Sequence, residues 1–158
     1  MDIEAGLTTA ASVDAVLKYV DDLAVYPEWM SLVHSATRDV GAPEPTWNVE
    51  LRASVGPFAR SKRLRLVRTV NERGRIVFER HEIDGRTHAT WRLTVTIAPG
   101  LGAATSRADD GAGATTLTMQ LHYDGRFFVG VVESILQQNI DAGRKRLSEL
   151  LARRCGDR

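Results

Sequence analysis

Cysteine is almost absent from this sequence of 158 residues, which contains a single one, Cys155, in the polar tail ARRCGDR. One cysteine cannot form an internal disulfide, so a disulfide-stabilised fold is not expected. Long apolar runs are also missing, and no stretch approaches the ~20 residues that span a bilayer. The first residues, MDIEAGLTTAAS, lack the basic and apolar regions of a signal peptide. We therefore expect a cytoplasmic protein without stable membrane insertion.

An excess of charge of one sign is missing too, since 21 Lys and Arg residues stand against 20 Asp and Glu residues. Nucleic-acid binders usually carry a net positive charge, so we expect no nucleic-acid partner. One basic run, RSKRLRLVR at residues 60–68, alternates with apolar residues and predicts a strand with one solvated face.

Motifs for metal, nucleotide and nucleophilic chemistry are not found. The four histidines form no HxxxH or HxH pair, and no cysteine or carboxylate cluster completes a ligand set. No GxSxG motif marks a nucleophile, and GLG at residues 100–102 lacks the spacing of a phosphate-binding loop. We expect neither a metal nor a cofactor.

Helical patterns near the N-terminus follow a short predicted strand at residues 2–10. Ser12 is a suitable N-cap for a helix that runs to about Asp21. In the next segment, DLAVYPEWM, Pro27 suits the first turn of a second, short helix.

Beyond residue 32, apolar residues recur at every second position, which predicts five or six further antiparallel strands. The segment at about 98–115, APGLGAATSRADDGAGAT, predicts a mobile hairpin loop. A helix with one apolar face is predicted at about 127–152. This order predicts a single α+β domain over residues 1–158, in which a curved antiparallel sheet packs against the long C-terminal helix.

Three segments resemble the START-like, or SRPBCC, superfamily, which has the helix-grip fold. They are SVDAVLKYVDDLAVYPEWMSLV, EIDGRTHATWRL and NIDAGRKRLSELL. More narrowly, the chain is similar to the branch of polyketide cyclases/dehydrases and coenzyme Q-binding proteins. The resemblance covers essentially the whole chain in element order. It implies two short helices between the first and second strands, and a cavity for a hydrophobic small molecule between the sheet and the long helix.

Aromatase/cyclase members resemble the chain over VRTVNERGRIVFERHEIDG, which places Arg68 at the position of an arginine implicated in their cyclisation chemistry. The alternation independently puts Arg68 on the same face as Leu64, Leu66 and Val70. Where those cyclases have a tyrosine this chain has Val33, so one proton donor of that route is missing. Arg68 has two alternative roles here: it stabilises a carbonyl or oxyanion in the cavity, or its head group reaches solvent from a strand end.

Two residues, Asn139 and Gly143, interrupt the apolar face of the last helix and lie one turn apart. A glycine inside a helix costs about 0.5–1 kcal/mol relative to alanine, so close packing or room for a ligand should offset it. We expect both residues to face the sheet across a cavity, where Asn139 supplies a polar contact and Gly143 supplies clearance. A buried amide satisfied by its neighbours is the alternative for Asn139.

Seven further residues are predicted to contact the ligand, because they lie on inward faces or at the pocket rim. They are Tyr26, Trp29, Phe78, Arg80, Trp91, Tyr123 and Leu136. If Phe78 points inward so does Arg80, and an Arg80–Glu82 pair then either lines the pocket mouth or lies at a solvated strand end. A register shift of one residue would exchange the two faces of any of these strands.

The function expected from these patterns and the resemblance is binding of a hydrophobic, lipid-like or polycyclic small molecule. The alternative is a polyketide aromatase/cyclase or dehydratase in which Arg68 polarises a carbonyl. A third class is a regulatory protein whose surface binds a partner and whose cavity is vestigial. A monomer or a homodimer is compatible with all three.

Overall fold

The computed structural model describes residues 1–55, 57–100, 114–125 and 131–156. Within these ranges seven antiparallel strands form one sheet in the order β1-β7-β6-β5-β4-β3-β2. Helix α1 (Val13–Val20) and the 3-10 helix η1 (Leu23–Glu28) lie between β1 and β2, and α2 (Val131–Gly156) follows β7. The strands are β1 (Asp2–Thr9), β2 (Val33–Arg38), β3 (Thr46–Val55), β4 (Phe58–Glu72), β5 (Arg75–Arg80), β6 (Trp91–Pro99) and β7 (Thr115–Tyr123).

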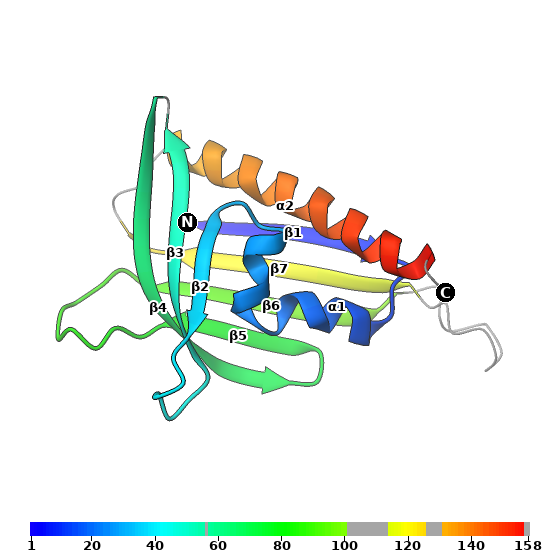
Figure 1. Cartoon of the computed structure of the whole chain (residues 1–158), viewed down its shortest axis with the longest axis horizontal. Helices are drawn as coiled ribbons and strands as arrows, with labels where there is room; N and C mark the ends of the chain where they lie inside the picture. Colours follow the sequence, from blue (N-terminus) through cyan, green and yellow to red (C-terminus); the bar gives the residue numbers. More distant parts are fainter. Residues whose placement is uncertain (56, 101–113, 126–130, 157–158) are drawn as a thin grey trace.

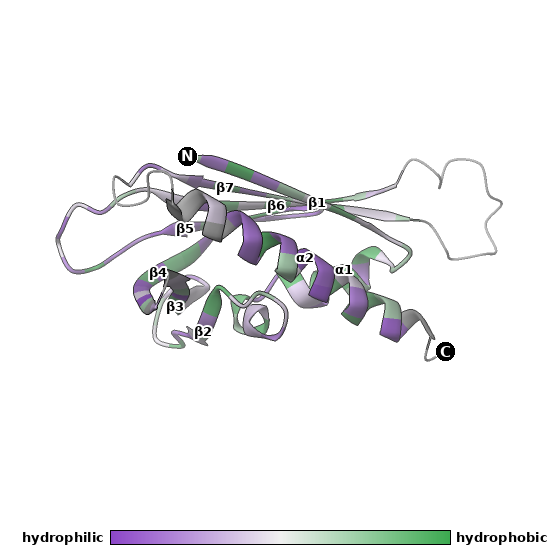
Figure 2. Cartoon of the chain, turned by 90° about the horizontal axis from the view of Figure 1, so that it is seen from above, coloured by the Kyte–Doolittle hydropathy of each residue, from purple (hydrophilic) through white to green (hydrophobic). Residues whose placement is uncertain are grey.

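The sheet is strongly bent around one face. In Figure 1, β1, β6 and β7 run along the length of the molecule, whereas β3 and β4 turn across it. Figure 2 shows α1 and α2 together on the same side of the strands β1, β5, β6 and β7. The strand register shifts between Arg68 and Val70 in β4, and such irregularities increase local bending and twist. The α+β helix-grip architecture predicted from the sequence is confirmed.

The first helix begins where the sequence predicts. The Ser12 side chain accepts a hydrogen bond from the Ala15 amide at 3.2 Å, with Ser12 in an extended conformation. This satisfies one of the amide groups that the first turn of a helix leaves without a partner. Asp21 caps the other end, and α1 buries Val16 and Val20 against the sheet.

The second helix differs from its prediction. Asp22 is its N-cap and accepts a hydrogen bond from the Ala24 amide at 2.9 Å, so η1 begins at Leu23. Pro27 therefore lies near the end of η1 and not in its first turn. The prediction was wrong because proline at the first helical position is only a preference, whereas the Asp22 cap fixes the actual start.

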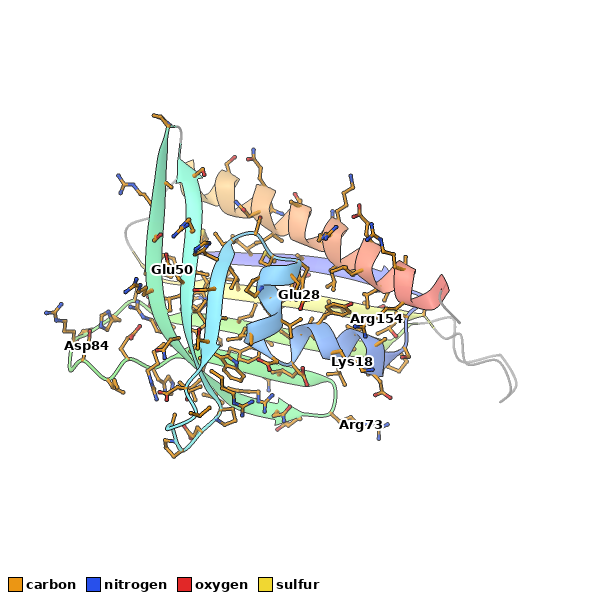
Figure 3. The ribbon with its side chains drawn as sticks, in the orientation of Figure 1. Lys18, Glu28, Glu50, Arg73, Asp84 and Arg154 are labelled. Carbon is orange, nitrogen blue, oxygen red and sulfur yellow. The ribbon has the colours of Figure 1, made fainter. Side chains whose placement is uncertain are left out.

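The hydrophobic core lies on the concave face of the sheet. Trp47 of β3 and Phe78 of β5 are fully buried, with ring centroids 5.5 Å apart in an edge-on arrangement. Charged side chains such as Lys18, Glu50 and Arg73 lie on the outside of the ribbon in Figure 3. The inward and outward positions alternate along the strands, as the period of two predicts. Val70 is an exception: the register shift after Arg68 pairs it with Val77, so it lies on the face opposite to Arg68 and its predicted inward position was wrong.

The C-terminal half agrees with the predicted elements where it is described. β6 ends at Pro99 and β7 begins at Thr115, so most of the loop predicted at about 98–115 lies outside the described residues. The same holds for the predicted start of the last helix at residue 127. The described helix continues to Gly156, beyond the predicted end at residue 152. Neither α1 nor α2, as far as the structure describes them, is both long and apolar enough to cross a membrane.

Candidate functional site

A cavity of about 100 Å³ lies between the concave face of the sheet, η1 and α2. Its walls are formed by inward-facing side chains, which occur at every second position of the strands. In β7, Leu117, Met119 and Leu121 line the cavity, whereas Gln120 between them is exposed on the opposite face. Ile140 and Leu147 of α2 close the cavity from the helix side.

Two of the predicted ligand-contacting aromatics, Tyr26 and Trp29, lie in the cavity wall, where η1 meets the sheet. The Tyr26 hydroxyl donates a hydrogen bond to the Val20 carbonyl at 3.0 Å, and the Trp29 indole N–H donates to the Tyr19 carbonyl at 3.0 Å. Burial raises the pKa of the Tyr26 hydroxyl far above its ordinary value, so this group stays neutral. Both polar tips are therefore engaged within the protein, and the two rings present apolar surface to the cavity.

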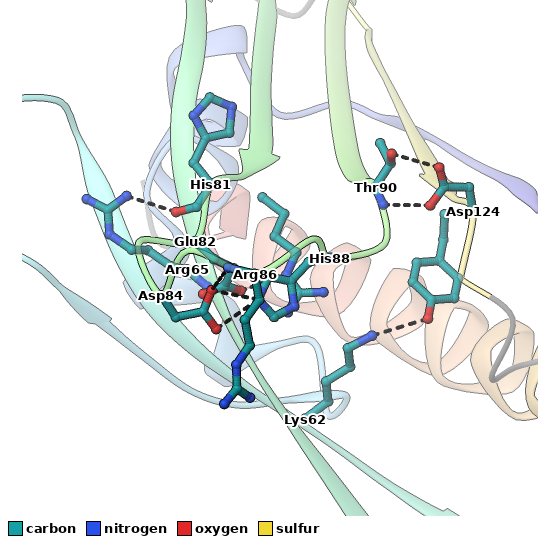
Figure 4. A network of polar contacts seen from close by, with 11 residues as sticks. Lys62, Arg65, His81, Glu82, Asp84, Arg86, His88, Thr90 and Asp124 are labelled. Carbon is teal, nitrogen blue, oxygen red and sulfur yellow. Dashed lines mark hydrogen bonds and ion pairs between the residues drawn. The ribbon is translucent and has the colours of Figure 1, made fainter.

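Trp91 and Tyr123 occupy opposed positions on β6 and β7. Trp91 lines the cavity, and Tyr123 packs behind it with ring centroids 5.6 Å apart. The Lys62 ammonium donates to the Tyr123 hydroxyl at 3.2 Å and lies 4.8 Å from the ring centroid (Figure 4). Lys62 was not predicted as a site residue, although its alternation with Leu64 and Leu66 places all three on the inner face of β4.

Phe78 and Arg80 point inward from β5 but do not line the cavity. The Arg80 side chain is only 8% exposed and forms an ion pair with Glu82, with 2.6 Å between Nε and the carboxylate oxygen. Its guanidinium also lies 3.1 Å from Nδ1 of His88, whose Nε2 lies 2.9 Å from Asp84. Of the two alternatives for this pair, the solvated strand end is wrong, because the loop after β5 folds back and covers Arg80.

This loop network, visible in Figure 4, also holds the loop against β4. Glu82 accepts a hydrogen bond from the Arg65 amide at 3.2 Å, and the Arg65 guanidinium donates to the His81 carbonyl at 2.9 Å. The hydrogen bond with His88 lowers the pKa of the Asp84 carboxyl below its ordinary value. The network therefore fixes the turn between β5 and β6 next to the end of the concave face.

Arg68 lies on the inner face of β4, as the alternation predicted. Its guanidinium donates a hydrogen bond to the Asp21 carbonyl at 3.0 Å and lies 5.8 Å from the centre of the Trp47 ring. Asp21 is the C-cap of α1, so the cation stands where a helix end carries partial negative charge. Neither of the two roles predicted for Arg68 describes it fully. Its guanidinium contacts the end of α1, and reaches neither into the cavity nor out to open solvent.

Asn139 and Gly143 lie against the segment after η1. The Ser31 hydroxyl lies 3.0 Å from the Asn139 side-chain oxygen and donates to it. A Cβ atom on Gly143 would lie 2.9 Å from the Met30 methyl carbon and 3.3 Å from the Trp29 carbonyl oxygen. The expectation that Gly143 gives clearance to a ligand was wrong, because that space holds Met30. The side chain of Leu136 lies outside the described part of α2.

The buried stripe of α2 is centred on other residues than predicted. Leu147 and Leu151 are almost fully buried, and Ile140 is half-buried. These positions follow the spacing of about 3.6 residues per turn. Asn139 lies 100° around the helix from Ile140 and therefore falls on the side that faces Ser31.

Metal ligands are not gathered anywhere in the described residues, since no three His, Cys, Asp or Glu side chains stand close enough to hold an ion. The candidate site is an apolar cavity whose described wall contains one charged side chain, that of Arg144.

The sequence matches the family described as polyketide cyclase / dehydrase and lipid transport over residues 2–152. The protein belongs to this family. The family description covers both catalysis on polyketides and transport of lipids, so membership supports a ligand-binding or a cyclase role. By sequence, no match is found among curated proteins.

Solved structures of similar proteins agree with this family assignment. A START superfamily protein from Mycobacterium smegmatis has a TM-score of 0.68 and 14% identity, with 96% of this chain and 97% of that chain covered. A protein from Thermus thermophilus has a TM-score of 0.66 and 16% identity, with 96% and 97% covered. StfQ, a di-domain ARO/CYC protein of the steffimycin biosynthetic pathway, has a TM-score of 0.61 and 15% identity, with 98% of this chain and 51% of StfQ covered. At these identities the likeness shows the fold alone.

Proposed function

We propose that this family member binds one hydrophobic small molecule in the cavity between the sheet, η1 and α2. The observation that carries the proposal is the apolar character of the described wall, in which Arg144 is the one charged residue. Apolar wall groups that face empty space lack the packing partners of a filled core. A hydrophobic ligand would supply those contacts and would gain roughly 25 cal/mol for each Å² of apolar surface removed from water.

The size of the cavity narrows the class of ligand. Its volume of about 100 Å³ is below the roughly 300–1,000 Å³ of common ligand pockets. An alkyl chain or a single ring therefore fits better than a polycyclic molecule. Met30 and Met119 line the wall, and their unbranched side chains can rearrange to admit a longer chain.

The polar groups near the cavity favour binding over acid–base catalysis. The Tyr26 hydroxyl and the Trp29 indole N–H donate hydrogen bonds to backbone carbonyls, and the Arg68 guanidinium donates to the Asp21 carbonyl. A general acid or base must lie within hydrogen-bonding distance of the reacting group. None of these three side chains offers a proton-transfer group to a molecule in the cavity.

A direct test is titration with neutral apolar probes, n-octanol and toluene, followed by intrinsic fluorescence, because Trp29 and Trp91 line the cavity. Saturable binding of one molecule per chain is expected. Ala5→Leu adds three carbon atoms inside the cavity and should weaken binding at least tenfold. Thr8→Leu places the same side chain on the exposed face of β1 and should leave binding unchanged. Absence of saturable binding, or equal binding by the Ala5 variant, would refute the proposal.

An aromatase/cyclase role is the second candidate, and the family description, which includes polyketide cyclases and dehydrases, supports it. In that role Arg68 would have to leave the Asp21 carbonyl and reach a substrate carbonyl. The test is incubation with a linear polyketide chain, comparing wild-type protein, Arg68→Ala and buffer alone. A product set specific to the wild type would support the cyclase role, whereas identical products in all three samples would exclude it.

A further inference from the structure

Arg144 combines two properties that no other side chain of the described cavity wall has. It is charged, and it is exposed, with half of its side-chain surface accessible to solvent. The remaining residues of that wall are buried or half-buried, apart from Gly6 of β1, which is exposed. The cavity therefore meets solvent where Arg144 and Gly6 line it.

The position of Arg144 on α2 explains this arrangement. Ile140 precedes it by one turn and Leu147 follows it by about one turn, and both line the cavity. α2 packs along β1, which is an edge strand of the sheet. On the β1 side the wall includes Ala5 and Gly6, whose small size leaves space between strand and helix. Arg144 therefore lines the cavity together with Ala5 and Gly6 of β1, and we place it at the seam between α2 and β1.

The guanidinium group of Arg144 favours a negatively charged ligand group at this opening. It presents several N–H donors in a planar fork that matches the oxygens of a carboxylate. Its partner in the structure is Asp141, one turn earlier on the same helix, at 3.5 Å. Such exposed ion pairs contribute little, so a carboxylate from a ligand can displace Asp141.

We infer that the ligand is a single-chain amphiphile with a carboxylate head group, which lies on Arg144 while its alkyl tail fills the cavity. This inference rests on the proposed function and specifies its ligand. The small cavity volume favours one chain over the two chains of a membrane lipid. The apolar wall recognises the tail, and the single cation at the opening fixes the orientation of the head.

Paired probes of equal chain length test this inference, n-octanoate against n-octanol, by calorimetric or fluorescence titration. Arg144→Met keeps an apolar stem and removes the charge. It should weaken octanoate binding about five- to twentyfold and change octanol binding less than twofold. Asp141→Asn removes the competing carboxylate and should strengthen octanoate binding.

Arg146→Met is the matched control. Arg146 also lies on α2, is equally exposed and pairs with Glu149 at 3.9 Å, but it is not part of the cavity wall. This variant should bind both probes as the wild type does. Thermal unfolding of the Arg144 and Arg146 variants shows whether each is folded. Raised salt should weaken octanoate binding in the wild type and in Arg146→Met, but not in Arg144→Met.

The two proposals fail in different ways. If the wild type binds neither probe, the apolar binding site itself is absent and both proposals fall. If it binds octanol, and Arg144→Met binds octanoate as tightly as the wild type, only the head-group role of Arg144 is overturned. If Arg146→Met weakens octanoate binding as much as Arg144→Met does, the effect is a general change of charge, and the inference is likewise overturned.

Discussion

The Arg68 guanidinium donates a hydrogen bond to the carbonyl of Asp21, the C-cap of α1, and so connects the middle of β4 to the end of that helix. Because a hydrogen bond from a charged group contributes about 1.5–3 kcal/mol, we expect Arg68→Met to lower the free energy of unfolding by about that amount. Urea denaturation measures it. Binding of n-octanol should stay within twofold of the wild type, whereas a large loss of binding in a folded variant would show that Arg68 contacts the ligand.

Arg68 also lies close enough to the Asp21 carboxyl to affect its charge, which predicts that the effect of Arg68→Met on stability depends on pH. Burial raises the pKa of this group above its ordinary value of 3.8, and Arg68 partly opposes that shift. A raised pKa stabilises the fold below the unfolded value, and this stabilisation is lost as the pH rises through the folded pKa. Without Arg68 the shift is larger, so the stability lost in Arg68→Met should grow from pH 3.5 to pH 7. In the double variant with Asp21→Asn this growth should vanish; its persistence would contradict the assignment.

The close approach of Gly143 to Met30 gives another prediction, because Met30 connects the packing of α2 to the cavity. Gly143→Ala gains about 1 kcal/mol of helix propensity, but its Cβ displaces the Met30 side chain, which lines the cavity. We expect nearly unchanged stability together with weaker binding of n-octanol. Met30→Ala in the same chain should restore binding by removing the displaced side chain. A marked loss of stability in Gly143→Ala would instead show that the Trp29 carbonyl, and not Met30, sets the limit.

A further prediction concerns the contact between the β5–β6 loop and the end of β7. Thr90 donates two hydrogen bonds to the Asp124 carboxylate, from its amide at 2.6 Å and from its hydroxyl at 2.8 Å. The Thr90 hydroxyl is the largest cause of the lowered pKa of Asp124, and its amide is the second. A lowered pKa gives stability that is present above the unfolded value of about 3.8 and is lost as the pH falls through the folded value.

We therefore expect Asp124→Ala to lower the midpoint of urea denaturation at pH 7, and to have little effect at a pH below the lowered pKa. Thr90→Val removes only the hydroxyl donor and should give a smaller loss with the same dependence on pH. A loss that is independent of pH would mean that the contact depends on packing and not on the carboxylate charge.

Local sequence patterns predicted most of the fold. The alternation in β4 and β7 identified the inner faces, and Ser12 identified the start of α1, because side-chain period and helix capping depend on near neighbours. Pro27 shows the limit of such reasoning. Two competing local signals were present, and the Asp22 cap determined the start of η1.

The candidate site followed from the sequence only in part. The resemblance to the START-like superfamily implied a cavity, and Tyr26, Trp29 and Trp91 line the cavity between the sheet, η1 and α2. Lys62 and Arg144 were missed, although the alternation in β4 contained a signal for Lys62. Arg144 had no such signal, since a charged residue near an apolar helix face resembles any solvated position.

The sequence by itself determined the order of the elements, the inner and outer faces of the strands, and the family. The tertiary structure decided what each inward polar residue contacts. Arg68 meets a carbonyl 47 positions away, and Asn139 meets a hydroxyl 108 positions away. Periodicity gives the direction of a side chain relative to its own element, but the partner depends on how distant elements pack. For that reason the same sequence could predict that Gly143 needs space, and only the folded chain could assign that space to Met30.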